Sequence, residues 1–455
     1  MSEPIVSNES AIQYFNQEAE KLIDLLTELH ETDTGRQPIG SVREEISLNI
    51  DESEVQYSFK TQDDHKGNEA YRYFYVSPNK WVGLDAQRYP IFRKLLGSLY
   101  KRKELNEIIS EGTLTEIIFY WMKTKYEKSE NAPSTLMEYI EKAVKEKIKN
   151  IKISIPISFL AIDSEFEIGN VKFEYFKKEL FDKIELKMKE GVETKKISER
   201  EVADFMQKLR KDYQGKACGT VHVRTEEEKA KEVAEREVER AIMALKYFSP
   251  SALYPKNTAS FGRKGISHLP MRYIFIYFDD IPNLFEGIVT NQPINFNINN
   301  RLLERIKKDG LDELSDLIKK NDLSEFEELL LTAIHTFTRA ISYYGYHEKI
   351  VFILSALEII FLKDSGEPIQ ISVGQRLGFF IDQGPDRRRE AVLLINDAYK
   401  IRSNFIHHGQ EKEDYEILGK LQLACWKALN IMIKNHDKFK NKQEFMLFIE
   451  RLIYS

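Results

Sequence analysis

Residues 399–409 read YKIRSNFIHHG, and this stretch decides how we interpret the C-terminal third of the chain. Apolar residues recur at helical spacing from Arg387 to His407, and Gly409 is suited to end that helix in the left-handed conformation. Arg402 and His407 are five residues apart, so their side chains point about 140° away from each other on a helix. A second copy related by a twofold axis would bring two arginines and two histidines around one cleft.

These side chains suit RNA cleavage without a metal ion. An imidazole is the side chain best suited to remove a proton near neutral pH, and the ribose 2′-hydroxyl is the proton source that RNA offers. A guanidinium is a permanently charged fork for a phosphate on which negative charge develops. We therefore predict His407 as general base, Arg402 as the stabilising cation, and Asn404 as an amide that orients the imidazole or a phosphate oxygen. The alternative makes Arg402 a salt-bridged surface residue and His407 a histidine near a helix end.

An acidic residue upstream is a candidate partner for these groups. Glu358 lies within the apolar run 350–361, where a carboxylate needs a partner because an unpaired buried charge is costly. It is predicted either to orient Arg402 or to pair with Arg376, and both interpretations stay open.

The stretch 399–409 resembles the signature of HEPN domains, in particular the Apea-like ones. Residues 350–361 are similar to an earlier core helix of that family, with Ala-Leu-Glu at positions 356–358, and residues 375–378, QRLG, resemble its intervening helix. The likeness covers residues 324–437. His408 also fits the histidine position of the motif, and His407 is favoured. In this resemblance Glu358, Arg376 and His408 are supporting residues.

The resemblance implies a helical bundle that forms a homodimer and, in the ribonuclease members, cleaves RNA at the arginine–histidine motif. Such domains serve in antiviral defence and in toxin systems. The expectation is therefore a metal-independent endoribonuclease that leaves a 2′,3′-cyclic phosphate, acting on tRNA or another structured RNA, under control of a phage-derived trigger or an antitoxin. The alternative is a non-catalytic HEPN-like scaffold that dimerises and binds RNA or a nucleotide.

The rest of the chain predicts an α+β protein. Residues 1–300 are expected to form a mixed α/β sensing or regulatory region, with a break between two subdomains near 180–225, and residues 301–455 to form the all-α bundle. In the first region we expect helices at 11–30, within 87–128, at 135–150 and at 225–248. Strands are expected at 45–50, 71–76, within 151–176, at 218–224 and at 273–278. In the second region we expect helices at 301–320, 325–343, 347–362, 373–380, 387–407 and 415–436.

Composition limits the other classes of function. The net charge is −6, and residues 321–455 hold 17 Lys and Arg against 19 Asp and Glu, so any RNA contact must be local. Cys218 and Cys425 are far apart and outside any zinc-binding spacing, which favours a reducing cytoplasm. The N-terminus has no signal-peptide pattern, and no apolar run is long enough to span a membrane. No cofactor and no metal are expected.

Overall fold

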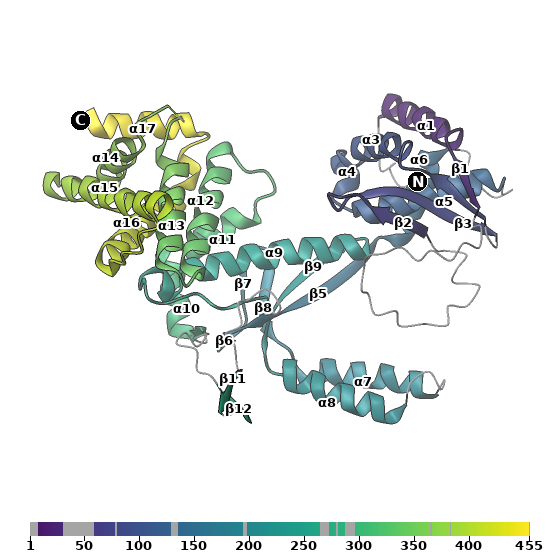
Figure 1. Cartoon of the computed structure of the whole chain (residues 1–455), viewed down its shortest axis with the longest axis horizontal. Coiled ribbons are helices and arrows are strands. Elements are labelled where there is room, and N and C mark those ends of the chain that lie inside the picture. The colour runs from purple at the N-terminus through teal and green to yellow at the C-terminus, as the bar shows by residue number, and fades with distance from the viewer. Residues whose placement is uncertain are drawn as a thin grey trace. The chain divides into compact units, whose positions relative to one another are not determined.

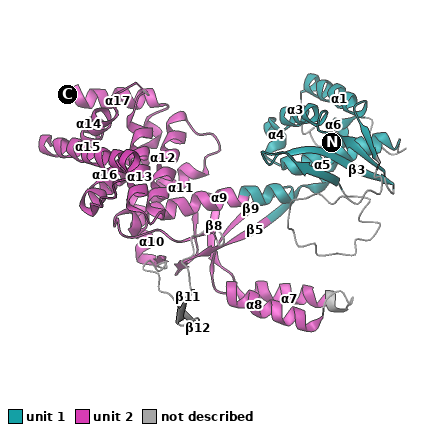
Figure 2. Cartoon of the chain, viewed as in Figure 1, with its two compact units in different colours: residues 1–151, 223–233 teal, residues 152–222, 234–455 magenta. Residues whose placement is uncertain are grey.

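The computed structural model describes residues 8–30, 59–77, 80–128, 135–193, 198–263, 273–278, 281–286, 296–364, 366–382 and 384–454. The chain forms two compact units, shown in Figure 2. Unit 1 comprises residues 1–151 and 223–233, and unit 2 comprises residues 152–222 and 234–455. The expected boundary at residue 300 lies inside unit 2.

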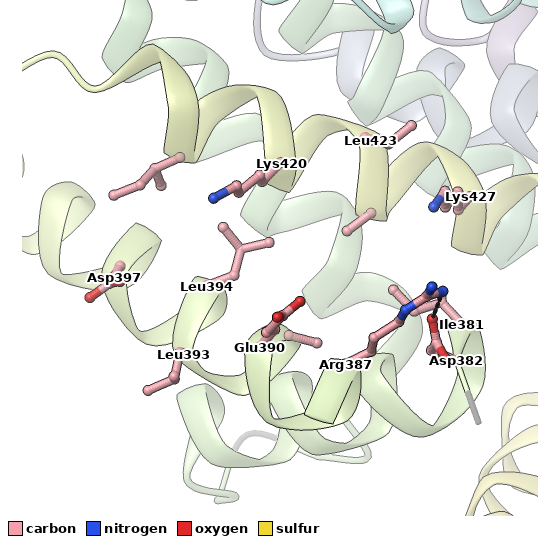
Figure 3. Close-up of a pocket in the computed structure, with 13 residues that line it drawn as sticks. Ile381, Asp382, Arg387, Glu390, Leu393, Leu394, Asp397, Lys420, Leu423 and Lys427 are labelled. Atoms are coloured by element: carbon pink, nitrogen blue, oxygen red, sulfur yellow. Dashed lines mark hydrogen bonds and ion pairs between the residues drawn. The ribbon is translucent and has the colours of Figure 1, made fainter. Parts of the chain in front are cut away.

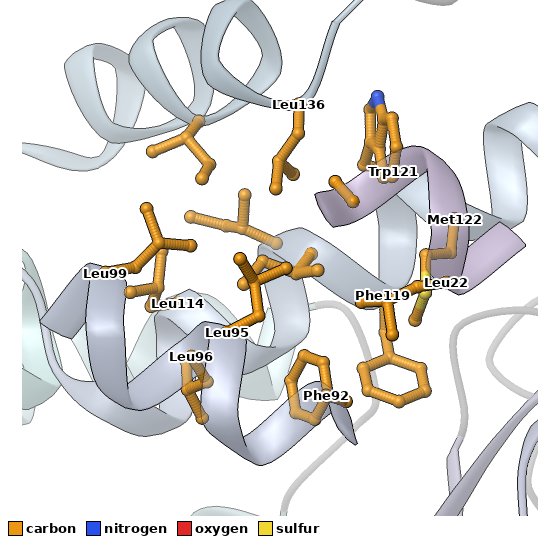
Figure 4. Packing of buried hydrophobic residues seen from close by; sticks show 14 of the residues in the cluster. Leu22, Phe92, Leu95, Leu96, Leu99, Leu114, Phe119, Trp121, Met122 and Leu136 are labelled. Atoms are coloured by element: carbon orange, nitrogen blue, oxygen red, sulfur yellow. The ribbon is translucent and has the colours of Figure 1, made fainter. Parts of the chain in front are cut away.

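Unit 1 is a four-stranded antiparallel sheet with helices. The strands are β1 (Thr27–His30), β2 (Phe59–Asp63), β3 (Glu69–Ser77) and β4 (Lys80–Leu84), in the order β1-β4-β3-β2. The helices are α1 (Glu9–Ile23), α3 (Tyr89–Tyr100), α4 (Lys103–Asn106), α5 (Glu111–Tyr126) and α6 (Leu136–Lys147). Figure 4 shows side chains of α1, α3, α5 and α6 packed in one core, among them Leu22, Leu99, Trp121 and Leu136.

Most of a five-stranded sheet, in the order β10-β5-β9-β8-β7, belongs to unit 2. Its strands are β5 (Lys149–Ser158), β7 (Phe166–Ile168), β8 (Val171–Tyr175), β9 (Ala217–Thr225) and β10 (Gly262–Arg263). Two strand pairs accompany it: β6 (Leu160–Ile162) runs parallel to β13 (Phe296–Ile298), and β11 (Tyr273–Phe278) is antiparallel to β12 (Ile281–Glu286). The helices α7 (Lys178–Glu193) and α8 (Glu199–Tyr213) pack together, and α9 (Glu227–Tyr247) and the short helix η1 (Pro250–Ala252) follow β9.

The C-terminal part of unit 2 is helical. Its elements are α10 (Asn300–Ile306), η2 (Lys307–Leu311), α11 (Asp312–Lys319), α12 (Glu325–Ser342), α13 (Tyr346–Phe361), α14 (Ile369–Ile381), α15 (Pro385–His408), α16 (Tyr415–Ile433), η3 (His436–Lys438) and α17 (Lys442–Tyr454). The apolar helix α13 contacts α12, α14, α15 and α16, and it lies in the middle of this bundle in Figure 1. The chain is thus a mixed α+β protein with a helical C-terminal region, as predicted.

Close packing places α14 against α15. A Cβ atom on Gly378 would lie 3.1 Å from the carbonyl oxygen of Arg388, and one on Gly374 would lie 3.2 Å from Cα of Val392. Only glycine leaves room for such an approach of two helices. The two glycines, one helical turn apart, therefore bring the start of α14 beside the C-terminal half of α15.

Several predicted elements differ from the structure. The helix expected at 11–30 ends at Ile23, and Thr27–His30 instead pair with β4, because strand partners distant in the sequence override a local pattern. The helix expected at 301–320 is interrupted at Gly310, whose φ of 126° is incompatible with a helix. The strand expected at 45–50 lies outside the described residues.

Candidate functional site

Arg402 and Tyr399 share one carboxylate. The Arg402 Nη1 atom donates to Oε1 of Glu358 over 2.9 Å, and the Tyr399 hydroxyl donates to the same oxygen over 2.7 Å. Residues 399 and 402 are three apart on α15, so their side chains share a face that meets α13. Burial and the hydrogen bond to Glu358 raise the pKa of Tyr399, so this hydroxyl remains a donor at neutral pH. Glu358 thus holds Arg402, and the sequence left this choice open.

A cavity of about 680 Å³ lies beside this group, and we call it the Arg402 cavity. Polar side chains from the signature stretch meet an apolar wall there. The lining residues are Pro368, Ile369, Gln370, Ile371, Tyr399, Arg402, Ser403, Ile406 and His407. The structure therefore brings Arg402 and His407 to the same cavity in a single copy of the chain, although they point to different sides of the helix.

His407 and His408 lie at the exposed end of α15. Both side chains are exposed, and His407 lines the Arg402 cavity whereas His408 is absent from its wall. Gly409 has a φ of 62°, and the N–H groups of Gly409 and Gln410 donate to the carbonyls of Phe405 and Asn404. The glycine therefore ends the helix as predicted, one residue beyond the histidine pair.

Asn404 lies elsewhere. It lines a second cavity, together with Lys400 and Lys412, and not the Arg402 cavity. Asn404 was predicted to orient the imidazole or a phosphate oxygen, whereas in the structure Asn404 and His407, three residues apart on α15, line different cavities. The structure thus separates Asn404 from Arg402 and His407.

Arg376 also lies apart from the site. Its guanidinium forms two hydrogen bonds to the Glu367 carboxylate, of 2.7 and 2.6 Å, and one of 2.6 Å to the Phe361 carbonyl. These contacts join α14 to the end of α13. Arg376 therefore does not pair with Glu358, and its support of the site is confined to fixing the helices around it.

Two neighbours of the site were not singled out from the sequence. No role was predicted for Tyr399, although its position one helical turn before Arg402 was a signal in the sequence. His347, in the first turn of α13, is buried and stacks on the Phe405 ring with 4.2 Å between the ring centroids. A lone histidine at a helix start gives no such signal in a sequence. In the structure His347 fixes Phe405 and thereby the last turn of α15.

A longer groove runs between α15 and α16 (Figure 3). In this view Leu394 of α15 points toward α16, and the charged side chains of Glu390 and Lys420 lie near it. Arg387 pairs with Asp382 at one end, and Asp397 lies at the other. Asp397 also lines the second cavity, so the groove and that cavity adjoin.

The chain matches no protein-family model, no curated protein and no solved structure. Across the part of the chain that the structure describes, every helix is too short or too polar to cross a membrane. Within the same residues no three His, Cys, Asp or Glu side chains come together as a metal-binding group.

Proposed function

We propose that this chain is a metal-independent endoribonuclease of the HEPN type, with the Arg402 cavity as its active site. The observation that carries the proposal is that Glu358 holds Arg402 in the wall of a cavity that His407 also lines. A cation and a base are thereby offered to one ligand, as a phosphodiester and its neighbouring hydroxyl require.

The reaction assigns one role to each group. His407 removes the proton of the ribose 2′-hydroxyl, and the 2′-oxygen forms a bond to phosphorus while the bond from phosphorus to the 5′-oxygen breaks. Arg402 stabilises the charge on the phosphate oxygens through the donors that Glu358 leaves free. The products are a 2′,3′-cyclic phosphate and a 5′-hydroxyl, whose proton the histidine of a second copy supplies.

The apolar surface around the cavity supports the proposal of a homodimer. Ile369, Ile371 and Ile406 line it and remain 39%, 54% and 52% exposed. Such apolar side chains beside a polar site favour contact with a partner surface. A twofold homodimer would cover them and place two histidines at one cleft. Through its resemblance, the chain is further proposed to act on tRNA or another structured RNA, in antiviral defence or as a toxin, under a phage-derived trigger or an antitoxin.

One observation favours the non-catalytic alternative. Among the described residues, the His407 side chain has no hydrogen-bond partner, and a catalytic base is normally oriented by a second group. The second candidate function is therefore an RNA- or nucleotide-binding dimer that uses Arg402 for recognition.

Cleavage of total cellular RNA by the purified full chain, with and without a chelator, separates the two. We expect chelator-resistant cleavage with cyclic phosphate ends, reduced at least about 100-fold by His407→Ala and by Arg402→Ala. Sedimentation and circular dichroism would check that both variants stay folded dimers. RNA binding without cleavage would support the alternative, and cleavage that both substitutions leave unchanged would contradict the proposal.

A further inference from the structure

The second cavity carries features that the proposed reaction does not use. It has a volume of about 270 Å³ and lies between the last turns of α15 and the start of α16. We call it the Lys400 pocket. Its lining residues are Asp397, Lys400, Ile401, Asn404, Gln410, Lys412, Asp414 and Ile417. Its size is near the lower end for small-molecule sites, which run from about 300 to 1,000 Å³, so it suits one nucleotide rather than several.

Most polar side chains of this pocket have no hydrogen-bond or ion-pair partner among the described residues. Asp414 caps α16 by accepting from the N–H groups of Glu416 and Ile417. The side chains of Asp397, Lys400, Asn404, Gln410 and Lys412, by contrast, form no hydrogen bond or ion pair among the described residues. Two free cations, one free carboxylate and two free amides therefore line one small cavity.

This set matches a phosphate and a base in one ligand. The lysine ammonium groups suit a phosphate, and the amides of Asn404 and Gln410 can each donate and accept. A carboxylate accepts only, so Asp397 selects a group with adjacent donors. Guanine is the RNA base whose pairing edge offers two neighbouring N–H donors, N1–H and the 2-amino group. Adenine, cytosine and uracil offer a donor beside an acceptor.

The pocket also has the right neighbours. Lys400 and Asn404 flank Ser403 on α15, and Ser403 lines the Arg402 cavity. One strand of RNA that crosses α15 can thus place a phosphodiester at Arg402 and an adjoining nucleotide beside Lys400. We propose that the Lys400 pocket binds a guanosine of the RNA substrate next to the bond that is cut. This inference rests on the proposed function, and it makes Asn404 a specificity residue.

Binding to an uncut RNA tests the pocket apart from catalysis. Full-length His407→Ala protein would be titrated with two fluorescent single-stranded hexamers, five uridines with either one guanosine or one adenosine. We expect the guanosine hexamer to bind at least about fivefold more tightly, because the mismatched base leaves polar groups of the pocket unpaired. Asp397→Asn should abolish this preference, since an amide places a donor opposite a donor.

The lysines supply the matched control. Lys400→Ala and Lys412→Ala should weaken binding of both hexamers about tenfold, since each removes a charge-assisted contact. Lys427→Ala should leave binding unchanged, because Lys427 is an exposed lysine of the adjoining groove outside this pocket. Equal affinity for both hexamers, a preference that survives Asp397→Asn, or equal behaviour of the three lysine variants would overturn the pocket.

The two proposals fail in different ways. If the guanosine preference is lost in Asp397→Asn but the wild-type chain cleaves no RNA, the pocket proposal is supported and the nuclease proposal is contradicted. Cleavage that depends on Arg402 and His407, without any guanosine preference, would do the reverse. Guanosine monophosphate that binds the wild-type chain but not Asp397→Asn, and that displaces neither hexamer, would identify a free nucleotide as the ligand of the pocket and would overturn the substrate subsite.

Discussion

Two arginine–carboxylate pairs within the bundle differ in how many donors of the guanidinium they engage and in how exposed their side chains are. Arg376 and Glu367 form a two-pronged pair with side chains only 12% and 18% exposed, and Arg376 also holds the Phe361 carbonyl. Arg402 and Glu358 form a single contact, with side chains 28% and 21% exposed, and Arg402 faces a cavity. The first pair leaves the guanidinium little to offer a ligand. The second holds a guanidinium in place and leaves donors free.

The bundle thus uses one arginine to fix its helices and another to present a cation to a cavity. A guanidinium whose donors are all engaged mainly stabilises the packing of the helices that it joins, because removing either partner leaves a largely buried charge without its counterion. A guanidinium held by one oxygen can bind an anion without losing its position. Substitutions at the two sites should therefore affect different measurements.

The largest difference is expected for activity. Arg402→Lys keeps the charge but loses the planar fork, so RNA cleavage should fall about 100-fold, whereas Arg376→Lys should leave the rate within about threefold. Initial rates on one defined RNA, at a temperature where both variants are folded, would measure this. Equal losses at the two positions would remove the distinction between the pairs.

Stability should show the opposite order. Arg376→Ala leaves the Glu367 carboxylate without its paired cation and is expected to lower the free energy of unfolding by about 3 kcal/mol. Arg402→Ala should cost about 1 kcal/mol, since its pair is more exposed and makes one contact. Urea denaturation of the full chain would give both values, read from the transition of the helical bundle. A larger loss in Arg402→Ala would contradict the assignment of Arg402 to the site.

A smaller effect on activity is expected from Glu358→Gln. The amide retains the shape but holds Arg402 less firmly, so cleavage should fall about tenfold, mainly in kcat, with KM little changed. Glu358→Asp, which keeps the charge on a shorter side chain, should recover part of the loss. A Glu358→Gln protein as inactive as Arg402→Ala would indicate that Glu358 acts directly in the reaction.

The smallest effect concerns pH. The hydrogen bonds from Arg376 hold the pKa of Glu367 below its ordinary value of 4.5. A carboxyl with a lowered folded-state pKa stabilises the protein above about pH 4.5, and this contribution is lost as the pH falls through the folded-state value. Glu367→Gln should therefore be less stable than wild type at pH 7, and the difference should shrink in acid. Thermal unfolding from pH 7 to 3 would test this, and a constant difference would contradict it.

Local signals predicted the C-terminal helices well. Ser324 and Glu327 form a capping box at the start of α12, and Gly409 ends α15, because both depend on residues a few positions apart. The strand at Tyr71–Val76 was predicted by its alternation and lies within β3. The start, end or alternation of each of these elements is determined by residues close together in the sequence.

Other elements depend on contacts that sequence reasoning did not supply. The charged helices α7 and α8 were not predicted, and the buried residues of their small core are Phe181, Val202 and Met206, with partly buried side chains packed around them. At the site, the motif indicated Arg402 and His407. It could not indicate which arginine pairs with Glu358, because the contact with Arg402 joins residues 44 positions apart. The spacing of Asn404 and His407 could not show that they line different cavities, because this depends on how α14 and α16 pack around α15.

The glycine pair of α14 sets the width of the Arg402 cavity from a distance. Ile369, Ile371 and Arg402 belong to the two helices that Gly374 and Gly378 hold together, yet neither glycine lines the cavity. A methyl group at position 378 would sit 3.1 Å from a backbone oxygen and push the helices apart by a few tenths of an ångström. A larger side chain at position 378 would thus change the width of the Arg402 cavity from outside it, with every side chain of the cavity wall left unaltered.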